Sequence, residues 1–252
     1  EAWRASLEPF TLEHAERVTG VPAADIAQAA RWYATPPFAG SCLIWGMGIT
    51  QHVNGIHNAH ALLNLSLVAG QMGFPASGIS PLRGQNNVQG CGDAGCIPTN
   101  LPGYQQYDPE TLARFEQAWG TRPPGRTGRV VTEMVEGCLT GETRAMYVVG
   151  ENPLLSEPDL HHAEKAIGQL DFLVVQDLFL HETAERAHVF LPAAAFAEKE
   201  GTFTNSERRV QRVRQALPPP GLARPDWWIT CELARRVARR LGPSATIYAQ
   251  AV

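Results

Sequence analysis

One arginine stands alone among amide side chains in the segment PLRGQNNVQG, residues 81–90. Arg83 is followed within two positions by Gln85, and no acidic residue in the segment neutralises the guanidinium. A guanidinium stays charged at every working pH and presents a planar fork that matches a carboxylate. Because hydrogen-bonding side chains pack poorly in a core and glycines favour turns, the segment predicts a loop that holds a polar group.

Two glycine-containing turns follow apolar segments of strand length. The turn WGMGITQ, residues 45–51, follows SCLIW, and VVGENPLLSEPD, residues 148–159, follows AMYVV. Glycine lets a ligand approach the backbone closely, and N–H groups at such turns can bind phosphate. Neither turn is a complete GxGxxG sequence, so an ordinary tight turn is the alternative for each.

An acidic residue follows a third apolar segment, FLVV at 172–175. Asp177 lies 27 positions after Gly150, roughly where dinucleotide-binding folds place an acid that bonds ribose hydroxyls or a base edge. A carboxylate there could accept two hydrogen bonds from a diol or from guanine. The alternative is that Asp177 caps the following turn.

A further polar segment, EGTFTNSERR at 200–209, contains the candidate residue Asn205. The alternative is that this segment is a solvated loop that leads to the basic strand VQRVR.

The histidines and cysteines do not predict a metal site. His57 and His60 share a helical face near His52, but no carboxylate stands at matching spacing and HExxH is absent. Packing or hydrogen-bonding roles are therefore favoured. Cys91 and Cys96 have no second pair suited to zinc, which favours a structural or incidental role.

Short apolar segments alternate with helical patterns along the chain. Strands are expected at 41–45, 145–149, 172–175 and 187–191, and helices at 11–19, 21–33, 56–68, 109–119, 130–139, 158–167 and 227–241. Residues 70–107 show little periodicity and are expected to be irregular. This alternation predicts βαβ units, and hence an α/β protein with a parallel sheet covered by helices on both faces.

Composition narrows the class of protein. The chain has 252 residues, 44% of them hydrophobic, and a formal net charge of −4, so nucleic-acid binding through phosphate neutralisation is disfavoured. Apolar stretches are interrupted well before the ~20 residues that a membrane-spanning helix needs, which predicts no membrane insertion. Five scattered cysteines without a signal peptide favour reduced thiols and a cytoplasmic location.

Several motifs occur in a characteristic order over nearly the whole chain: WGMGITQH, RGQNNVQG, PGYQ, VVGENP, VVQDLFLHETA, VFLPA, EGTFTNSERRVQ and DWW. In this order they resemble the catalytic (alpha) subunits of molybdenum or tungsten formate dehydrogenases, within the molybdopterin oxidoreductase family. The resemblance implies Rossmann-like αβα layers that bind molybdopterin guanine dinucleotide.

The resemblance also implies roles for individual residues. Arg83 corresponds to the active-site arginine that faces the metal and orients formate, and Gln85 corresponds to a neighbour that contacts the pterin. The first dinucleotide would be bordered by Gly46, Met47 and Gln51.

The second dinucleotide would lie on the turn after the strand at 145–149, with its guanosine end recognised by residues farther along the chain. Ala193 stands where relatives often have a hydroxyl residue, so no side-chain contact is expected there. The candidate residues are Gly150, Glu151, Asn152, Ser156, Gln176, Asp177, Asn205 and Asp226.

For the parent enzyme, the resemblance implies oxidation of formate to carbon dioxide at a bis-(molybdopterin guanine dinucleotide) metal centre. Electrons would leave through iron–sulfur clusters to partner subunits. The metal-ligating cysteine or selenocysteine beside a histidine, and the cysteine motif for a 4Fe-4S cluster, are not found in this sequence. Together with a first residue, Glu1, that is not Met, this suggests a central fragment that is inactive in isolation. Residues 1–84 would be the C-terminal part of one cofactor-binding domain, and 85–252 most of a second.

Three alternatives remain open at this point. Another enzyme of the same family, such as a nitrate reductase, would share the dinucleotide turns. A cofactor-binding module without chemistry would share them too. An NAD-binding dehydrogenase is disfavoured by the incomplete glycine fingerprint.

Overall fold

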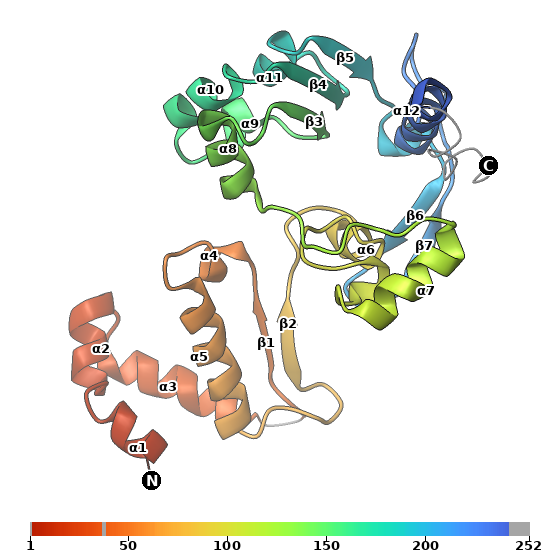
Figure 1. The fold of residues 1–252 in the computed structure, drawn as a ribbon. Helices are drawn as coiled ribbons and strands as arrows, with labels where there is room; N and C mark the ends of the chain where they lie inside the picture. Colours follow the sequence, from red (N-terminus) through yellow and green to blue (C-terminus); the bar gives the residue numbers. More distant parts are fainter. Residues whose placement is uncertain (1, 37–38, 242–252) are drawn as a thin grey trace. The chain divides into compact units, whose positions relative to one another are not determined.

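The computed structural model describes residues 2–36 and 39–241 (Figure 1). The chain divides into two compact units, Glu1–Asn86 and Asn87–Val252, and each is described by itself. All strand pairs in the two principal sheets are parallel. The predicted α/β class with parallel sheets is therefore confirmed.

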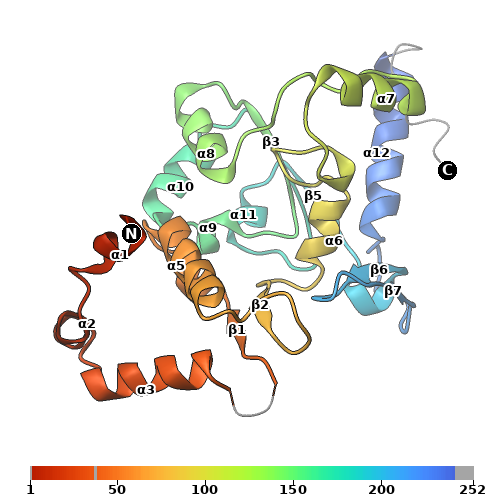
Figure 2. The same ribbon diagram turned by 90° about the horizontal axis from the view of Figure 1, so that it is seen from below.

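Unit 1 is built around two parallel strands. Strand β1 pairs with β2 from Cys42↔Gly78 to Trp45↔Pro81, and α5 lies beside them in both views (Figure 1, Figure 2). The Thr11 side chain caps α2 by accepting a 3.1 Å hydrogen bond from the His14 backbone N–H. The elements are α1 (Ala2–Leu7), α2 (Leu12–Thr19), α3 (Ala23–Ala34), β1 (Cys42–Trp45), α4 (Met47–Thr50), α5 (Gly55–Val68) and β2 (Gly78–Pro81).

A buried glutamine fixes the point where the chain enters β1. The Gln71 side chain accepts a 2.8 Å bond from the Ser41 N–H and donates a 3.2 Å bond to the Ala34 carbonyl. Tyr33 and Ser66, whose hydroxyls lie 2.6 Å apart, join α3 to α5. Buried polar groups need such partners, and these bonds fix the start of the strand that leads to the GMGITQ turn.

The prediction of an irregular segment at 70–107 is wrong in part. It contains β2, the helix α6 (Val88–Asp93) and the short 3₁₀ helix η1 (Pro102–Tyr104). Strand β2 was not predicted because it has only four residues, of which the first is a glycine and the last a proline. As a result, Arg83 follows directly after a strand that is paired with β1.

Unit 2 contains a three-stranded parallel sheet in the order β3-β4-β5. The register runs from Ala145↔Phe172 to Val149↔Gln176, and from Val174↔Val189 to Asp177↔Pro192. The elements after η1 are α7 (Pro109–Trp119), α8 (Val131–Thr140), β3 (Ala145–Val149), α9 (Pro153–Ser156), α10 (Leu160–Ile167), β4 (Phe172–Asp177), α11 (Glu182–Glu185), β5 (Val189–Pro192), the 3₁₀ helix η2 (Phe196–Glu198), β6 (Gly201–Thr204), β7 (Val210–Val213) and α12 (Asp226–Leu241).

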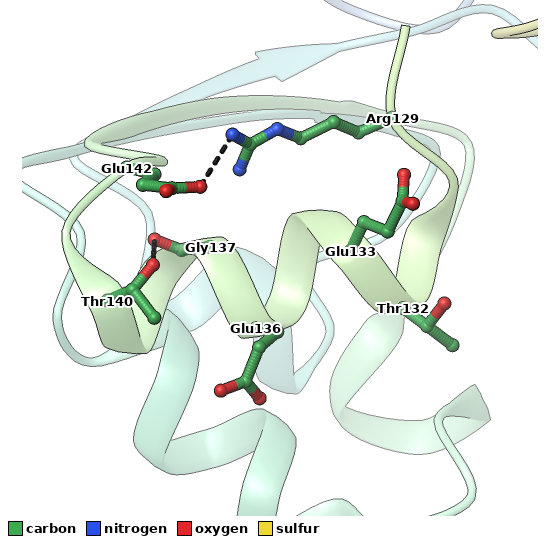
Figure 3. Close-up of a pocket in the computed structure, with 7 residues that line it drawn as sticks. All are labelled: Arg129, Thr132, Glu133, Glu136, Gly137, Thr140 and Glu142. Atoms are coloured by element: carbon green, nitrogen blue, oxygen red, sulfur yellow. Dashed lines mark hydrogen bonds and ion pairs between the residues drawn. The ribbon is translucent and has the colours of Figure 1, made fainter.

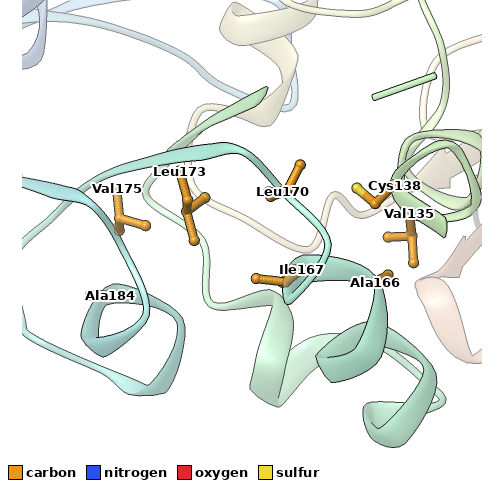
Figure 4. Close-up of a cluster of buried hydrophobic side chains, with 8 residues drawn as sticks. All are labelled: Val135, Cys138, Ala166, Ile167, Leu170, Leu173, Val175 and Ala184. Carbon is orange, nitrogen blue, oxygen red and sulfur yellow. The ribbon is translucent and has the colours of Figure 1, made fainter. Parts of the chain in front are cut away.

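The core of unit 2 lies between β4 and the helices that pack on it (Figure 4). Leu173 and Val175 of β4 are 1% and 0% exposed, and they pack in one cluster with Ile167 of α10 and Cys138 of α8. Burial of such side chains is the main stabilising contribution to folding. The central strand is therefore fixed, and its carboxyl end at Asp177 is fixed with it.

The segment EGTFTNSERR is a hairpin rather than a solvated loop. Its first half forms β6, which pairs antiparallel with β7 from Gly201↔Val213 to Thr204↔Val210. The basic segment VQRVR was correctly predicted to be a strand. Its partner was missed because GTFT is short and half of its side chains are exposed.

Candidate functional site

A cavity of about 250 Å³ lies at the carboxyl edge of the sheet in unit 2. Gly150 follows β3, Asp177 ends β4 and Ala193 follows β5, and because these three strands are parallel neighbours their ends meet at one edge. Asp226 joins them from the start of α12. The lining residues are Gly150, Gln176, Asp177, Leu178, Ala193, Ala194, Ala195, Phe196, Lys199 and Asp226. Edges of this kind are where ligands bind in open α/β sheets.

The Asp226 carboxylate is held by two residues. Gln176, which is fully buried, donates a 2.7 Å hydrogen bond from Nε2 to Oδ1 of Asp226, and the Lys199 ammonium pairs with Oδ2. The side-chain oxygen Oε1 of Gln176 accepts a hydrogen bond from the Tyr147 hydroxyl. Burial raises the pKa of Tyr147, and the negative charge of Asp226 raises it further. Tyr147 therefore orients the Gln176 amide, and the Nε2 end of that amide positions Asp226.

The Asp177 carboxylate also has two partners within the protein. Its Oδ1 accepts a 2.5 Å bond from the Leu178 N–H, and its Oδ2 lies 3.3 Å from Nε2 of His181. Nδ1 of His181 accepts the Ala184 N–H at 3.3 Å at the start of α11, so the proton of a neutral His181 lies on Nε2 and points to Asp177. A carboxylate has about four acceptor positions. Two of them remain for a ligand at Asp177.

Gly150 contributes space rather than a hydrogen-bond donor. It has φ +65°, and a Cβ placed on it would meet no heavy atom within 4 Å. Its N–H donates a 2.9 Å bond to the Gln176 carbonyl. The turn after β3 therefore lets a ligand approach the backbone, although this N–H is already used within the sheet.

The cavity is not lined by Glu151, Asn152 or Ser156, which are the candidate residues that follow Gly150. The Asn152 side chain donates to Glu182 at 2.7 Å and accepts from the buried Thr183 hydroxyl at 2.7 Å. The bond from Asn152 is the largest cause that lowers the pKa of Glu182. Ser156 donates to Oε1 of Glu151 at 2.8 Å. This network connects the turn after β3 to α11 and thereby fixes the edge of the cavity.

The Asn205 side chain closes the turn between β6 and β7. Its Oδ1 accepts bonds of 3.0 Å from the N–H groups of Glu207 and Arg209. Asparagine commonly stabilises turns in this way. Only its Nδ2 group is left for a ligand.

Unit 1 places its predicted residues at the ends of β1 and β2. The Leu82 N–H donates to the Trp45 carbonyl at 2.7 Å, so the turn after β1 and the loop after β2 start side by side. A Cβ on Gly84 would lie 2.8 Å from the Met47 methyl group, which shows that Met47 contacts the loop that contains Arg83. Gly46 precedes α4 as its N-cap residue, and a Cβ added to it would meet no heavy atom within 4 Å.

Three further candidates from the sequence are exposed in unit 1. Arg83, Gln85 and Gln51 are all accessible to solvent. Among the residues that the structure describes, no hydrogen bond or ion pair to the Arg83 guanidinium is found. Its charge is thus available to an anion.

Another cavity, of about 500 Å³, lies against α8 (Figure 3). Arg129 and Glu142 form a 2.6 Å ion pair across it, and Glu133 accepts the Val130 N–H at 3.1 Å. It contains none of the predicted site residues and no strand end. Its charged groups serve mainly to stabilise the ends of α8.

Two kinds of feature are absent from the described part of the chain, residues 2–36 and 39–241. No cluster of three or more His, Cys, Asp or Glu side chains there could hold a metal ion. No helix there has the length and apolar character needed to cross a membrane.

The model of the molybdopterin oxidoreductase family matches residues 28–236. The chain belongs to the molybdopterin oxidoreductase family. The match includes both strand-end sites. The family implies a pterin cofactor with molybdenum or tungsten.

Curated relatives are much longer than this chain. It is 44% identical over 228 residues to the F420-dependent formate dehydrogenase 2 subunit alpha of Methanococcus maripaludis, covering 90% of this chain and 33% of that protein. It is 40% identical over 239 residues to formate dehydrogenase H of Escherichia coli, covering 94% of this chain and 33% of that protein. The chain thus spans about a third of the length of these relatives.

A solved structure supports the fold. Acetylene hydratase from Pelobacter acetylenicus superposes with a TM-score of 0.67 at 19% identity, covering 92% of this chain and 34% of that chain. At this identity the likeness is one of fold.

The residues that line the cavity in unit 2 can accept hydrogen bonds from a ligand that carries N–H or O–H groups. Acceptor positions remain on Asp177 and Asp226, which suit the N–H groups of guanine or the hydroxyls of ribose. The space above Gly150 allows a ligand to approach the backbone closely.

Three residues of this site were not predicted from the sequence: Lys199, Tyr147 and His181. Lys199 is one of only two lysines in the chain, a rarity that could have drawn notice.

Proposed function

We propose that the complete protein oxidises formate to carbon dioxide at a molybdenum or tungsten centre held by two molybdopterin guanine dinucleotides. The relatives named above include formate dehydrogenase H and a formate dehydrogenase subunit alpha, which supports formate as the substrate. The metal cofactor would supply the two-electron redox chemistry. Electrons would then pass through iron–sulfur clusters to partner subunits.

The cavity at the carboxyl edge of β3, β4 and β5 is the observation on which the role of this chain rests. We assign it to the guanosine end of one dinucleotide, with Asp177 and Asp226 accepting hydrogen bonds from guanine or ribose. Gln176 and Lys199 hold Asp226 in place. Glu151, Asn152 and Ser156 would act by fixing the neighbouring turn, and Asn205 by shaping the hairpin.

The ends of β1 and β2 in unit 1 would bind the substrate. Arg83 would bind the carboxylate of formate through its planar fork and orient it. Gly46, Met47 and Gln51 would border the other dinucleotide, and Gln85 would contact the pterin. The contact of Met47 with Gly84 supports a common site for these two loops.

Cofactor retention tests the guanosine site. Asp177→Asn and Asp226→Asn in the complete protein should each weaken retention of the pterin dinucleotide about tenfold or more, because a charge-assisted hydrogen bond contributes about 1.5–3 kcal/mol. Asp171→Asn is the matched control, since Asp171 is exposed and ion-paired with Arg144 at 2.5 Å. Pterin and metal contents equal to those of the control in both variants would contradict the assignment.

Substrate assays test the reaction. The complete protein should turn over formate, and nitrate reduction without formate turnover would instead favour the nitrate reductase alternative. Residues 1–252 alone, supplied with cofactor, should show no formate oxidation. Detectable activity in that sample would contradict the division of the active site among several segments.

A further inference from the structure

Helix α6 ends in a double hydrogen-bonded cap. The Gly95 N–H donates to the Gly92 carbonyl and the Cys96 N–H donates to the Cys91 carbonyl, each at 3.0 Å. Gly95 has φ +84°. These two bonds and the left-handed glycine define a Schellman motif, in which the residue after the glycine folds back onto the last turn of the helix.

The two residues that this motif brings together are both cysteines. A side-chain contact between these positions commonly accompanies the motif, and here they are Cys91 and Cys96. Both are exposed, unpaired thiols. Burial raises the pKa of the Cys91 thiol, and the nearby charge of Cys96 and a hydrogen bond with it raise the pKa further.

We propose that Cys91 and Cys96 are a redox modification site that forms a reversible disulfide across the C-terminal end of α6. The oxidant is a low-molecular-weight disulfide such as oxidised glutathione. The thiolate of one cysteine attacks a sulfur of this oxidant and releases one thiol, and the second cysteine then attacks the mixed disulfide and releases the other. Two protons pass from the cysteines to the released thiols, so the oxidant is reduced and the pair is oxidised.

The backbone already holds the two cysteines close to each other, as a disulfide requires. A disulfide requires Cα atoms about 4.4–6.8 Å apart, and the bond between the Cys96 N–H and the Cys91 carbonyl holds the two residues together. The start of α6 is held separately, since the Thr204 N–H donates to the Asn87 side chain at 2.9 Å. The linkage would therefore fix the last turn of the helix without requiring the helix to move.

The other cysteines offer no comparable pairing among the described residues. Cys138 is buried in the core of unit 2, and Cys42 and Cys231 lie far from this cap in the sequence. Cys42 is exposed and provides an internal reference for a thiol without a resolving partner.

Mass spectrometry of the complete native protein tests the site. After treatment with oxidised glutathione and blocking of free thiols with N-ethylmaleimide, the peptide that contains both cysteines should lack two hydrogen atoms and carry no adduct. Cys96→Ser should instead accumulate a glutathione adduct on Cys91. Separate adducts on Cys91 and Cys96 in the unmodified sequence, or no reaction at either thiol, would overturn the proposal.

A pair of glycine variants tests whether the cap is responsible. Gly95→Ala would place a Cβ 2.7 Å from the Pro102 backbone nitrogen at a position with φ +84°. This strain should slow the linkage at least about tenfold, which corresponds to about 1.4 kcal/mol or more. Gly103→Ala, at φ +73° with its nearest contact at 3.7 Å, is the matched control and should keep the original rate. Equal rates in the two variants would overturn the role of the motif.

Discussion

The buried amide of Gln176 should stabilise the edge of the sheet measurably, and Gln176→Met tests this. The substitution keeps the side-chain length and removes both hydrogen bonds. The bond to the Asp226 carboxylate, at 2.7 Å, is charge-assisted and contributes about 1.5–3 kcal/mol, and the neutral bond from Tyr147 contributes about 0.5–1.5 kcal/mol. Lys199 still pairs with Asp226 and the methionine gains apolar burial. We therefore expect a net loss of about 2–3 kcal/mol.

Hydrogen exchange of the complete protein provides the assay, because it reports the local stability of individual strands. Peptides from β3 and β4 should exchange roughly 30- to 150-fold faster in Gln176→Met, at about 1.4 kcal/mol per factor of ten. Gln211→Met is the matched control, since Gln211 is exposed on β7, and it should change the free energy of local opening by less than about 0.5 kcal/mol. Equal exchange in the two variants would refute the assigned role of Gln176.

Three further predictions concern charge, packing and pH. Arg83→Lys should lower kcat/KM for formate at least about 100-fold, because the substrate would be misplaced, and should leave the metal content unchanged. Arg126→Lys, at another exposed arginine, is the control. Equal activities of the two variants would count against a role of Arg83 in substrate binding. Gly55→Ala should destabilise the α4–α5 region by about 2 kcal/mol or more, because the added Cβ would lie 2.0 Å from the Thr50 carbonyl oxygen. Hydrogen exchange measures this loss. Gly48→Ala should be tolerated, because a Cβ added there meets no heavy atom within 4 Å. The pKa of Glu182 is lowered in the folded protein, mainly by its hydrogen bond with Asn152. This bond therefore stabilises the fold fully above the ordinary glutamate pKa of about 4.3, and the stabilisation is lost as the pH falls through the lowered pKa. Asn152→Ala should therefore show a smaller loss of thermal midpoint over that acidic range, and an unchanged pH profile would contradict this explanation.

The sheet of unit 2 could be predicted because its strands are continuous apolar segments. AMYVV and FLVV have the composition of strands buried in a parallel sheet, and the turns after them were recognisable from glycine and asparagine. Strand β2 has too few apolar residues to stand out, and its pairing with β1 depends on tertiary structure. The β6–β7 hairpin was missed for a similar reason, since its turn depends on the Asn205 side chain.

The sequence indicated some of the residues that line the cavity, but not the hydrogen bonds that they make within the protein. Parallel topology implies that residues after adjacent strands meet, and Gly150 and Asp177 do line one cavity. Asp226, which the family resemblance implied, lines the same cavity from the start of α12. Sequence alone does not show which polar groups are already satisfied. Gln176 was predicted to recognise the guanosine end, and the structure adds that its side-chain amide is bonded to Tyr147 and Asp226. Lys199 could not be placed because its partner is 27 positions away.

A structure of the complete protein with its cofactor bound is the most direct test. We predict that a guanine or ribose group lies in the cavity after β3, β4 and β5, with a donor about 2.7–3.2 Å from a carboxylate oxygen of Asp177 or Asp226. A nucleotide bound elsewhere, with both carboxylates facing only protein or water, would contradict the assignment of this cavity.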